Sequence, residues 1–213
     1  DAFPSRARVL EREGATITVH GYGLLPDRWN AEWSEAEKYT EMWQRAEYRA
    51  SAPGEECADI FLVWAAPHGR VIDFGCGTGR GALRLHAAGM DVVCVDFTDN
   101  SRDAEAMSLP FVQHDLTRPI MLRAPYGFCT DVLEHIAPEW VESVICNIMQ
   151  AASCVFFQIS TVPDSLGGLI GQELHLTVKP HEWWHALFVS LGFVVERSED
   201  RGQASLFLIL DRT

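Results

Sequence analysis

From residue 70 onward, short apolar segments alternate with segments of helical periodicity. The apolar segments carry β-branched and aromatic residues, and each is too short for a helix that spans the core. Strands of this kind, separated by helices, are typical of βαβ units and of a parallel sheet covered on both faces. The segments are RVIDF (70–74), DVVCVDF (91–97), LPFVQHD (109–115), YGFCTDV (126–132) and CVFFQIS (154–160), with GRGALRLHAAG (79–89) and PEWVESVICNIMQAA (138–152) as the clearest helices between them.

The end of the chain departs from this alternation. After a predicted helix in PHEWWHALFVSLG, the apolar segments FVVERSED (193–200) and QASLFLIL (203–210) are separated by only two residues. A parallel crossover needs a dozen residues or more. The last two strands are therefore expected to form an antiparallel hairpin at the edge of the sheet.

Residues 1–69 have a different pattern, rich in tryptophan, charge and helix signals. SEAE, beginning at Ser34, is a capping box, and apolar residues from Trp33 to Ala46 then recur at helical spacing. A second helix is expected to follow Pro53. The pattern predicts two parts, a helical cap or lid over residues 1–69 and an α/β domain over residues 70–213.

Composition and charge narrow the class of protein. The chain has 213 residues, 47% of them hydrophobic, and no apolar stretch long enough for a membrane helix. Its net charge of -13 disfavours duplex nucleic acid as a main partner. The six cysteines form no C-x-x-C pair, which indicates reduced thiols and a cytoplasmic protein. The sequence does not specify an oligomeric state.

A glycine-rich turn follows the first predicted strand, in VIDFGCGTGRG. Gly75, Gly77 and Gly79 alternate there, and glycines let a backbone turn sharply and lie close to a ligand before a helix begins. Read as G-x-G-x-x-A, the turn fits the dinucleotide fingerprint of nicotinamide enzymes. Read as D-x-G-x-G-x-G, it resembles the first motif of methyltransferases that use S-adenosylmethionine (SAM).

Asp73 helps to separate these two cofactor classes. Its carboxylate, at the end of the strand, could attract the cationic methionine end of SAM, whereas it would face the pyrophosphate of NAD unfavourably. The SAM alternative is therefore favoured. Asp73, Gly75, Cys76, Gly77 and Gly79 become candidate cofactor-binding residues.

Two further segments resemble the class I family of SAM-dependent methyltransferases. VDFTDN places Asp96 where that family holds the ribose hydroxyls, and Phe97 where a ring stacks on adenine. VQHDL places Asp115, with Leu116 beside it, where the family contacts the adenine amino group. The resemblance implies that these four residues bind the cofactor.

A fourth motif, CTDVLEHI (129–136), resembles the family sequence D-x-L-E-H, which borders the methionine end of the cofactor and the transfer site. The resemblance spans residues 70–213. It implies a Rossmann-like seven-stranded sheet with a terminal antiparallel hairpin, Asp131 at the methionine end, and methyl transfer to an oxygen or nitrogen of a small-molecule acceptor.

Within this family the chain looks most similar to methyltransferases of quinone biosynthesis. EMWQRAEYR in the cap resembles their lead-in segment, in which a tyrosine and an arginine cover the cofactor. Tyr39, Tyr48 and Arg49 are the candidates for that role. An amphipathic helix with solvated charges is the alternative.

Two histidines are candidates for the catalytic base, because imidazole titrates near neutral pH. His135 ends the fourth-strand motif, and His175 precedes the last helix, in a loop (161–178) expected to shape the acceptor pocket. A structural, hydrogen-bonded role is the alternative for each. At the level of the whole protein, an NAD(P)-binding oxidoreductase and a non-catalytic SAM-binding module remain alternatives.

HEWWH (181–185) matches the zinc-binding pattern H-E-x-x-H. A zinc hydrolase also needs a third protein ligand, and no glycine and histidine follow at the metzincin spacing. The two tryptophans instead suggest packing against the sheet. We therefore expect no metal ligands in this motif, and none elsewhere in the chain.

Overall fold

The computed structural model describes residues 9–12, 15–18, 33–50 and 52–212, in two compact units that divide at residue 33. In the first unit, strands β1 (Val9–Arg12) and β2 (Ala15–Thr18) pair in an antiparallel hairpin. The other residues of the N-terminal half of the predicted cap lie outside the described residues.

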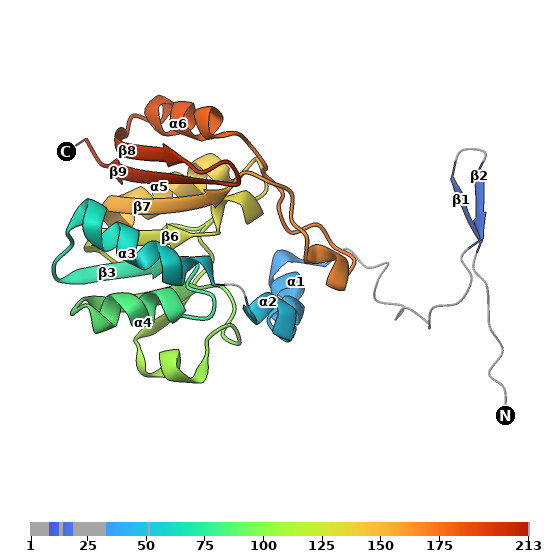
Figure 1. Cartoon of the computed structure of the whole chain (residues 1–213), viewed down its shortest axis with the longest axis horizontal. Helices are drawn as coiled ribbons and strands as arrows, with labels where there is room; N and C mark the ends of the chain where they lie inside the picture. The colour runs from blue at the N-terminus through green and yellow to red at the C-terminus, as the bar shows by residue number, and fades with distance from the viewer. Residues whose placement is uncertain (1–8, 13–14, 19–32, 51, 213) are drawn as a thin grey trace. The chain divides into compact units, whose positions relative to one another are not determined.

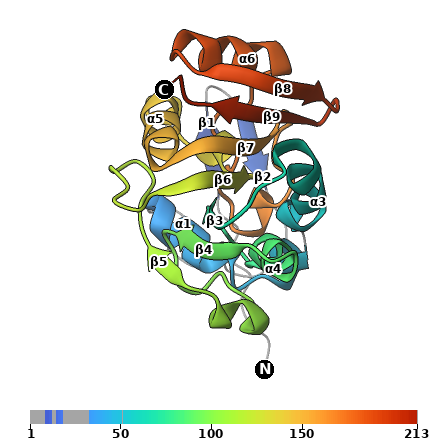
Figure 2. The ribbon, with the colours of Figure 1, turned by 90° about the vertical axis from the view of Figure 1, so that its left-hand side faces the viewer.

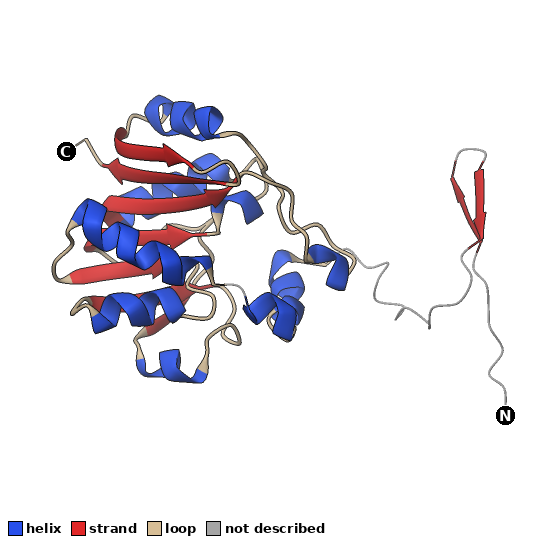
Figure 3. Ribbon diagram, viewed as in Figure 1, coloured by secondary structure: helices blue, strands red, loops and turns tan. Residues whose placement is uncertain are grey.

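The second unit contains a seven-stranded sheet in the order β5-β4-β3-β6-β7-β9-β8 (Figures 1 and 3). The first five strands of this order are parallel, and β9 is antiparallel to both β7 and β8. The predicted parallel sheet with a terminal antiparallel hairpin is confirmed. The strands are β3 (Arg70–Phe74), β4 (Asp91–Asp96), β5 (Phe111–Gln113), β6 (Ala124–Thr130), β7 (Ala152–Ser160), β8 (Val194–Asp200) and β9 (Ala204–Leu210).

Helices cover both faces of the sheet, as the nearly continuous apolar strands require (Figure 2). On one face, α3 (Pro53–Ala65) and α4 (Arg80–Ala87) pack over a cluster that includes the fully buried Phe61. On the other face, α5 (Val141–Ala151) and α6 (His181–Ser190) pack over a second cluster that includes the fully buried Trp184. Burial of such side chains contributes about 1.5–3 kcal/mol each.

The structure divides the chain at residue 33, whereas the sequence pattern predicted a boundary near residue 69. Helix α3, which lies before residue 69, packs on the sheet. Its Phe61 packs on Phe128 of β6 and Phe156 of β7, so this helix is part of the core. Of the helices predicted for the cap, only those before residue 51 are not part of the two apolar clusters on the faces of the sheet.

The capping box predicted at Ser34 is present, with the serine and Glu37 each accepting a backbone N–H of the other. The helix that it starts, α1 (Glu35–Met42), is shorter than the apolar spacing predicts, because the chain turns at Trp43 before α2 (Ala46–Ala50). Tyr39 and Met42 of α1 form a small third cluster with Ile170 and Leu174. The cap and the loop over residues 161–178 are thus packed on one another.

Short 3-10 helices complete the described elements: η2 (Ala104–Ser108), η3 (Leu133–His135) and η4 (Gly167–Leu169). Among the described helices, none combines the length and the apolar character that a membrane crossing requires. All six cysteines are free thiols, and four of them are buried.

Candidate functional site

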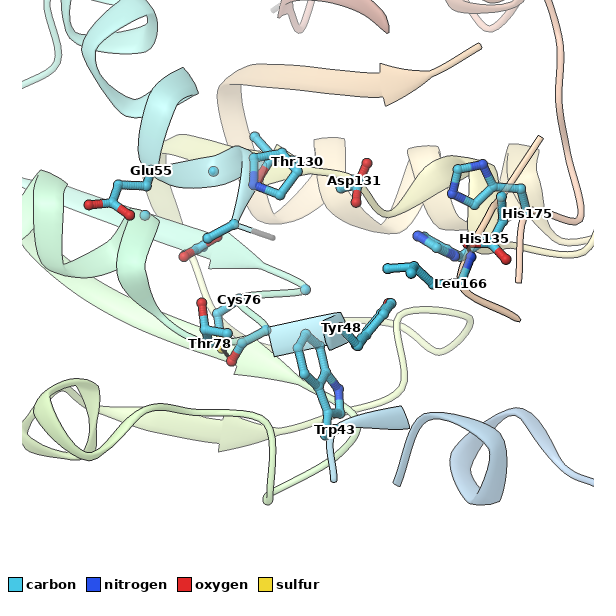
Figure 4. Close-up of a pocket in the computed structure, with 18 of the residues that line it drawn as sticks. Trp43, Tyr48, Glu55, Cys76, Thr78, Thr130, Asp131, His135, Leu166 and His175 are labelled. Carbon is cyan, nitrogen blue, oxygen red and sulfur yellow. Dashed lines mark hydrogen bonds between the residues drawn. The ribbon is translucent and has the colours of Figure 1, made fainter. Parts of the chain in front are cut away.

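A cavity of about 270 Å³ lies beyond the carboxyl ends of β3 and β6, where ligands bind in doubly wound sheets (Figure 4). Four parts of the chain surround it: the cap, the start of α3, the glycine-rich turn, and the loop over residues 161–178. Residues 162–166 and His175 of that loop line the cavity, at the position predicted for an acceptor pocket.

The glycine-rich turn bends under the cavity in a conformation that only glycine adopts without strain. Gly75 has a φ of +71°, and a Cβ added to it would lie 2.4 Å from Cγ2 of Val132. Gly77 has a φ of +50°, and its added Cβ would lie 3.0 Å from the ring of Trp43. The turn therefore brings bare backbone to the cavity, as the sequence predicted.

Asp96, at the end of β4, holds the glycine-rich turn in place. Its Oδ2 accepts the N–H of Gly77 at 3.0 Å, and its Oδ1 accepts both the N–H and the hydroxyl of Thr98 at 3.0 and 3.1 Å. Burial raises the pKa of Asp96, and these hydrogen bonds oppose the effect. Asp96 does not itself line the cavity, so its predicted contact with a ribose stays a prediction.

Asp73 reaches the cavity as a buried carboxyl group. Burial, and then the charge of Asp96, raise its pKa to about 7. Its backbone hydrogen bond with Ala82 acts in the opposite direction. A cation bound near Asp73 would favour the ionised form and relieve this cost.

The lining of the cavity has an excess of acidic side chains. Among the described residues that line it, four are acidic and none is lysine or arginine. In such a site a cationic ligand is attracted and a phosphate is repelled. The four acidic residues are Glu55, Asp73, Asp131 and Asp164.

The two candidate histidines meet at one end of the cavity (Figure 4). The ring centroids of His135 and His175 are 4.6 Å apart, with the rings nearly perpendicular. Nδ1 of His175 lies 2.7 Å from the carbonyl oxygen of Val162. Nδ1 of His135 lies 2.6 Å from the hydroxyl of Tyr39 and 3.1 Å from the carbonyl oxygen of Leu174.

Burial lowers the pKa of His135 to about 4, although the charge of Asp131 opposes the shift. The ring is therefore neutral at pH 7. A base of so low a pKa accepts a proton weakly, which makes His175 the better candidate of the two for that role.

Glu134 directly precedes His135 in the chain and is fully buried. Its Oε1 accepts the N–H of Ser160 at 2.6 Å, whereas Oε2 has no hydrogen-bond donor among the described residues. Burial raises the pKa of Glu134, and the adjoining carboxyl group of Asp131 raises it further. Glu134 had no predicted role, because its burial and its neighbours depend on the packing of η3.

Several predicted cofactor residues lie outside the cavity lining. Tyr39 is buried, and its hydroxyl contacts His135, so it supports that ring from the cap. Arg49 forms an ion pair with Asp103, which also binds Arg80 at 2.7 Å. The predicted residues absent from the lining are Tyr39, Arg49, Gly79, Asp96, Phe97, Asp115 and Leu116.

Two of these residues point to different roles in this structure. Asp115 lies beyond the end of β5 with half of its side chain exposed, and it accepts hydrogen bonds from Thr117. Leu116 is buried in the core cluster under α5. A contact of either with adenine stays a prediction.

Trp43 and Tyr48, from the segment before α3, line the cavity (Figure 4). Their rings are 4.7 Å apart, and the indole of Trp43 lies against Gly77. Nε1 of Trp43 is buried and has no hydrogen-bond partner among the described residues. From the sequence, Tyr48 was a candidate cofactor residue and Trp43 was expected only to pack within a helix. Packing in a helix and contact with a ligand both place apolar residues at the same spacing.

HEWWH forms the first part of α6, away from the cavity lining. Nδ1 of His181 bonds the hydroxyl of Ser205 at 3.0 Å, and its ring stacks on Phe207. His185 is exposed, and Trp184 is buried in the core. The only described histidine, cysteine and acidic residues that cluster closely enough to hold a metal are elsewhere, at Glu134, His135 and His175.

Known proteins share this fold. The PH0226 protein from Pyrococcus horikoshii OT3 is 15% identical with a TM-score of 0.64, over 82% of this chain and 99% of that chain. Magnesium protoporphyrin IX methyltransferase from Synechocystis PCC 6803, solved with bound SAM, is 16% identical with a TM-score of 0.60, over 86% and 93%. DhpI, solved with S-adenosylhomocysteine (SAH), is 18% identical with a TM-score of 0.60, over 83% and 95%.

The fold is therefore that of SAM-dependent methyltransferases, and the enzyme class and cofactor predicted from the sequence agree with these relatives. A search of curated proteins finds no match. The family model described as Tellurite resistance protein TehB matches residues 40–156, which is more than half of the chain. On this match, the chain belongs to the TehB family.

Proposed function

We propose that this protein is a methyltransferase that uses SAM to methylate an oxygen or nitrogen of a small-molecule acceptor. The observation that carries the proposal is the charge of the cavity: four carboxyl groups and, among its described lining residues, no lysine or arginine. SAM carries a sulfonium cation, which an acidic cavity stabilises. The family match and the glycine-rich turn beneath the cavity support the same conclusion.

The same charge argues against the oxidoreductase alternative. A dinucleotide brings a pyrophosphate with two negative charges to the glycine-rich turn. Here Asp73 lies beside that turn, buried and with its pKa raised, so a nearby anion would increase the cost of ionising it. A non-catalytic SAM-binding module differs from the proposed enzyme only in methyl transfer, which an assay measures.

The residues of this chain would act mainly by positioning. SAM supplies an activated methyl group, so the protein must align the acceptor with the breaking bond and exclude water. Asp73 and the glycine-rich turn would hold the cationic end, and Asp131 would border it. Trp43 and Tyr48 would cover the cofactor from the cap.

The acceptor would lie at the end of the cavity formed by His135, His175 and the loop over residues 162–166. We propose these two histidines as the residues that contact it, with His175 the better placed to accept a proton. Next to this end of the cavity, the cap and the loop pack together through Tyr39 and Leu174.

Two acceptor classes follow from the likenesses. The resemblance to quinone-biosynthesis enzymes suggests a phenolic hydroxyl, whereas the TehB family name suggests an oxyanion of tellurium. Among the described residues, the lining has no lysine or arginine that would bind a free oxyanion, so we favour the hydroxyl. The net charge of -13 argues against nucleic acid as an acceptor, and the free thiols fit a reducing compartment such as the cytoplasm.

Calorimetry with SAM, SAH and NAD tests the cofactor. SAM and SAH should bind and raise the melting temperature, because a ligand of the folded state stabilises it. Asp96→Ala should weaken binding of both by about 1–3 kcal/mol, since Asp96 holds the turn that contacts them. Binding of NAD without binding of SAH would overturn the proposal, and binding without transfer to any of a panel of phenols and amines would favour the non-catalytic module.

A further inference from the structure

His135 and His175, which line the cavity, form with the buried Glu134 a group that has the composition of a metal site. One ligand atom from each of Glu134, His135 and His175 lies within 4.8 Å of the other two. Two imidazoles and one carboxylate are the protein ligands of many catalytic zinc sites and of non-haem iron sites. Such sites leave one or more positions open for a substrate.

The carboxylate of this group has an oxygen without a partner. Glu134 is fully buried, and its Oε1 is satisfied by the N–H of Ser160, but Oε2 has no hydrogen-bond donor among the described residues. A buried, unpaired carboxylate oxygen is costly. The carboxyl group of Asp131 adjoins that of Glu134, so two carboxyl groups lie together here and a cation bound beside them would be attracted by both.

The two imidazoles are oriented as metal-binding histidines usually are. The hydrogen bonds of both rings are made by Nδ1. That of His175 contacts the carbonyl oxygen of Val162, and that of His135 contacts the hydroxyl of Tyr39 and the carbonyl oxygen of Leu174. Bonds of this kind fix the ring and direct the other nitrogen to a metal. No described residue hydrogen-bonds Nε2 of either ring.

We propose that Glu134, His135 and His175 bind a divalent transition-metal ion of the zinc type at the acceptor end of the cavity. Zinc lies about 2.0–2.2 Å from such ligand atoms, so rotations of the side chains would draw the three atoms together. The open positions of the ion would face the cavity.

The role of the ion in binding the acceptor rests on the proposed function, whereas metal binding itself does not depend on it. No described residue of the cavity lining is a lysine or arginine that could bind an anionic acceptor. An ion at this site would supply the missing positive charge. The acceptor class that fits is then a molecule with an ionisable hydroxyl, or two adjacent oxygens, that can bind the ion.

The test is metal binding by untagged protein, stripped with a chelator and titrated with Zn²⁺ in a calorimeter and with Co²⁺ by absorption spectroscopy. We expect one equivalent of each ion, with a visible Co²⁺ spectrum that reports nitrogen and oxygen ligands. His175→Ala and Glu134→Gln should each weaken Zn²⁺ binding by more than about 100-fold. Glutamine retains the oxygen that accepts the N–H of Ser160, and His175→Ala changes a loop residue, so the two variants need not fail together.

His185→Ala is the matched control, because it removes an exposed histidine of the zinc-like motif HEWWH and leaves the cavity intact. It should bind Zn²⁺ as the unaltered protein does. Absence of Zn²⁺ binding, or equal binding by His175→Ala, overturns the proposal, and loss in His185→Ala alone would assign the metal to HEWWH. SAH binding measured on the same samples separates this outcome from failure of the proposed function.

Discussion

Replacement of Asp73 by asparagine should stabilise the protein in the absence of cofactor, by an amount that depends on pH. The carboxyl group is buried at the end of β3, and asparagine has nearly the same shape without the charge. The ordinary pKa of aspartate is about 3.9, and burial together with the charge of Asp96 raises that of Asp73 to about 7. The folded protein therefore binds more protons than the unfolded chain between these two values.

The magnitude follows from the same two pKa values. Because the folded-state pKa of Asp73 is raised, its contribution to stability falls as the pH rises from about 4 to about 7 and is constant above that range. At about 1.4 kcal/mol for each of about three pKa units, ionised Asp73 costs the folded protein about 4 kcal/mol at pH 8. At pH 4 the cost is about 0.5 kcal/mol.

Urea unfolding at pH 4, 6 and 8 measures the effect. Asp73→Asn should gain about 0.5 kcal/mol over the unaltered protein at pH 4 and up to about 4 kcal/mol at pH 8. Asp91→Asn, which changes an exposed aspartate paired with Arg70, should show no such trend. If the gain in stability of Asp73→Asn does not grow with pH, or if the variant is less stable at pH 8, burial does not raise the pKa of Asp73.

The same substitution tests whether the carboxylate of Asp73, which lowers the stability of the folded protein, binds the cofactor. If Asp73 attracts the sulfonium of SAM, Asp73→Asn should bind SAM more weakly at pH 8 even though it is more stable. SAH lacks the sulfonium, so its affinity should fall less. Equal losses for both ligands would assign Asp73 to another part of the cofactor.

Three further substitutions test the packing of the glycine-rich turn, of α3 and of α6. Gly75→Ala should cost at least about 1–2 kcal/mol in the free energy of unfolding, because its φ is +71° and its added Cβ meets Val132. Phe61→Ala should cost about 3–5 kcal/mol if α3 belongs to the sheet core, and little if it belongs to a separable cap. His181→Ala should cost about 1 kcal/mol through its bond to Ser205 and leave SAH affinity unchanged. Urea unfolding and calorimetry measure all three.

The strand and helix pattern was predictable from the sequence because it depends on neighbouring residues. The alternation of short apolar segments with helical periodicity predicted the parallel strands, and the two residues between the last segments predicted the hairpin of β8 and β9. The glycine-rich turn was predictable for the same reason. Its glycines are needed for the local conformation, and Gly75 and Gly77 have positive φ values in the structure.

The functions of single side chains at the site were less predictable. Arg49 forms an ion pair with Asp103, which is distant in the sequence and which no local pattern indicated; its predicted contact with a cofactor stays a prediction. Trp43 lies on Gly77 for a similar reason, since the chain turns after α1 and brings the indole over the turn. An apolar spacing shows that a residue packs, and it does not show what it packs against.

The sequence by itself determined the sheet, its connections and the place of the cavity, because strand ends and turns are local properties of the chain. Only the tertiary structure decided which charged groups meet there. Glu134 and His175 come from different segments, and the folding of the loop over residues 161–178 onto the sheet brings them together. The burial that raises the pKa of Asp73 and leaves an oxygen of Glu134 unpaired likewise arises from packing by the whole unit, which no short motif encodes.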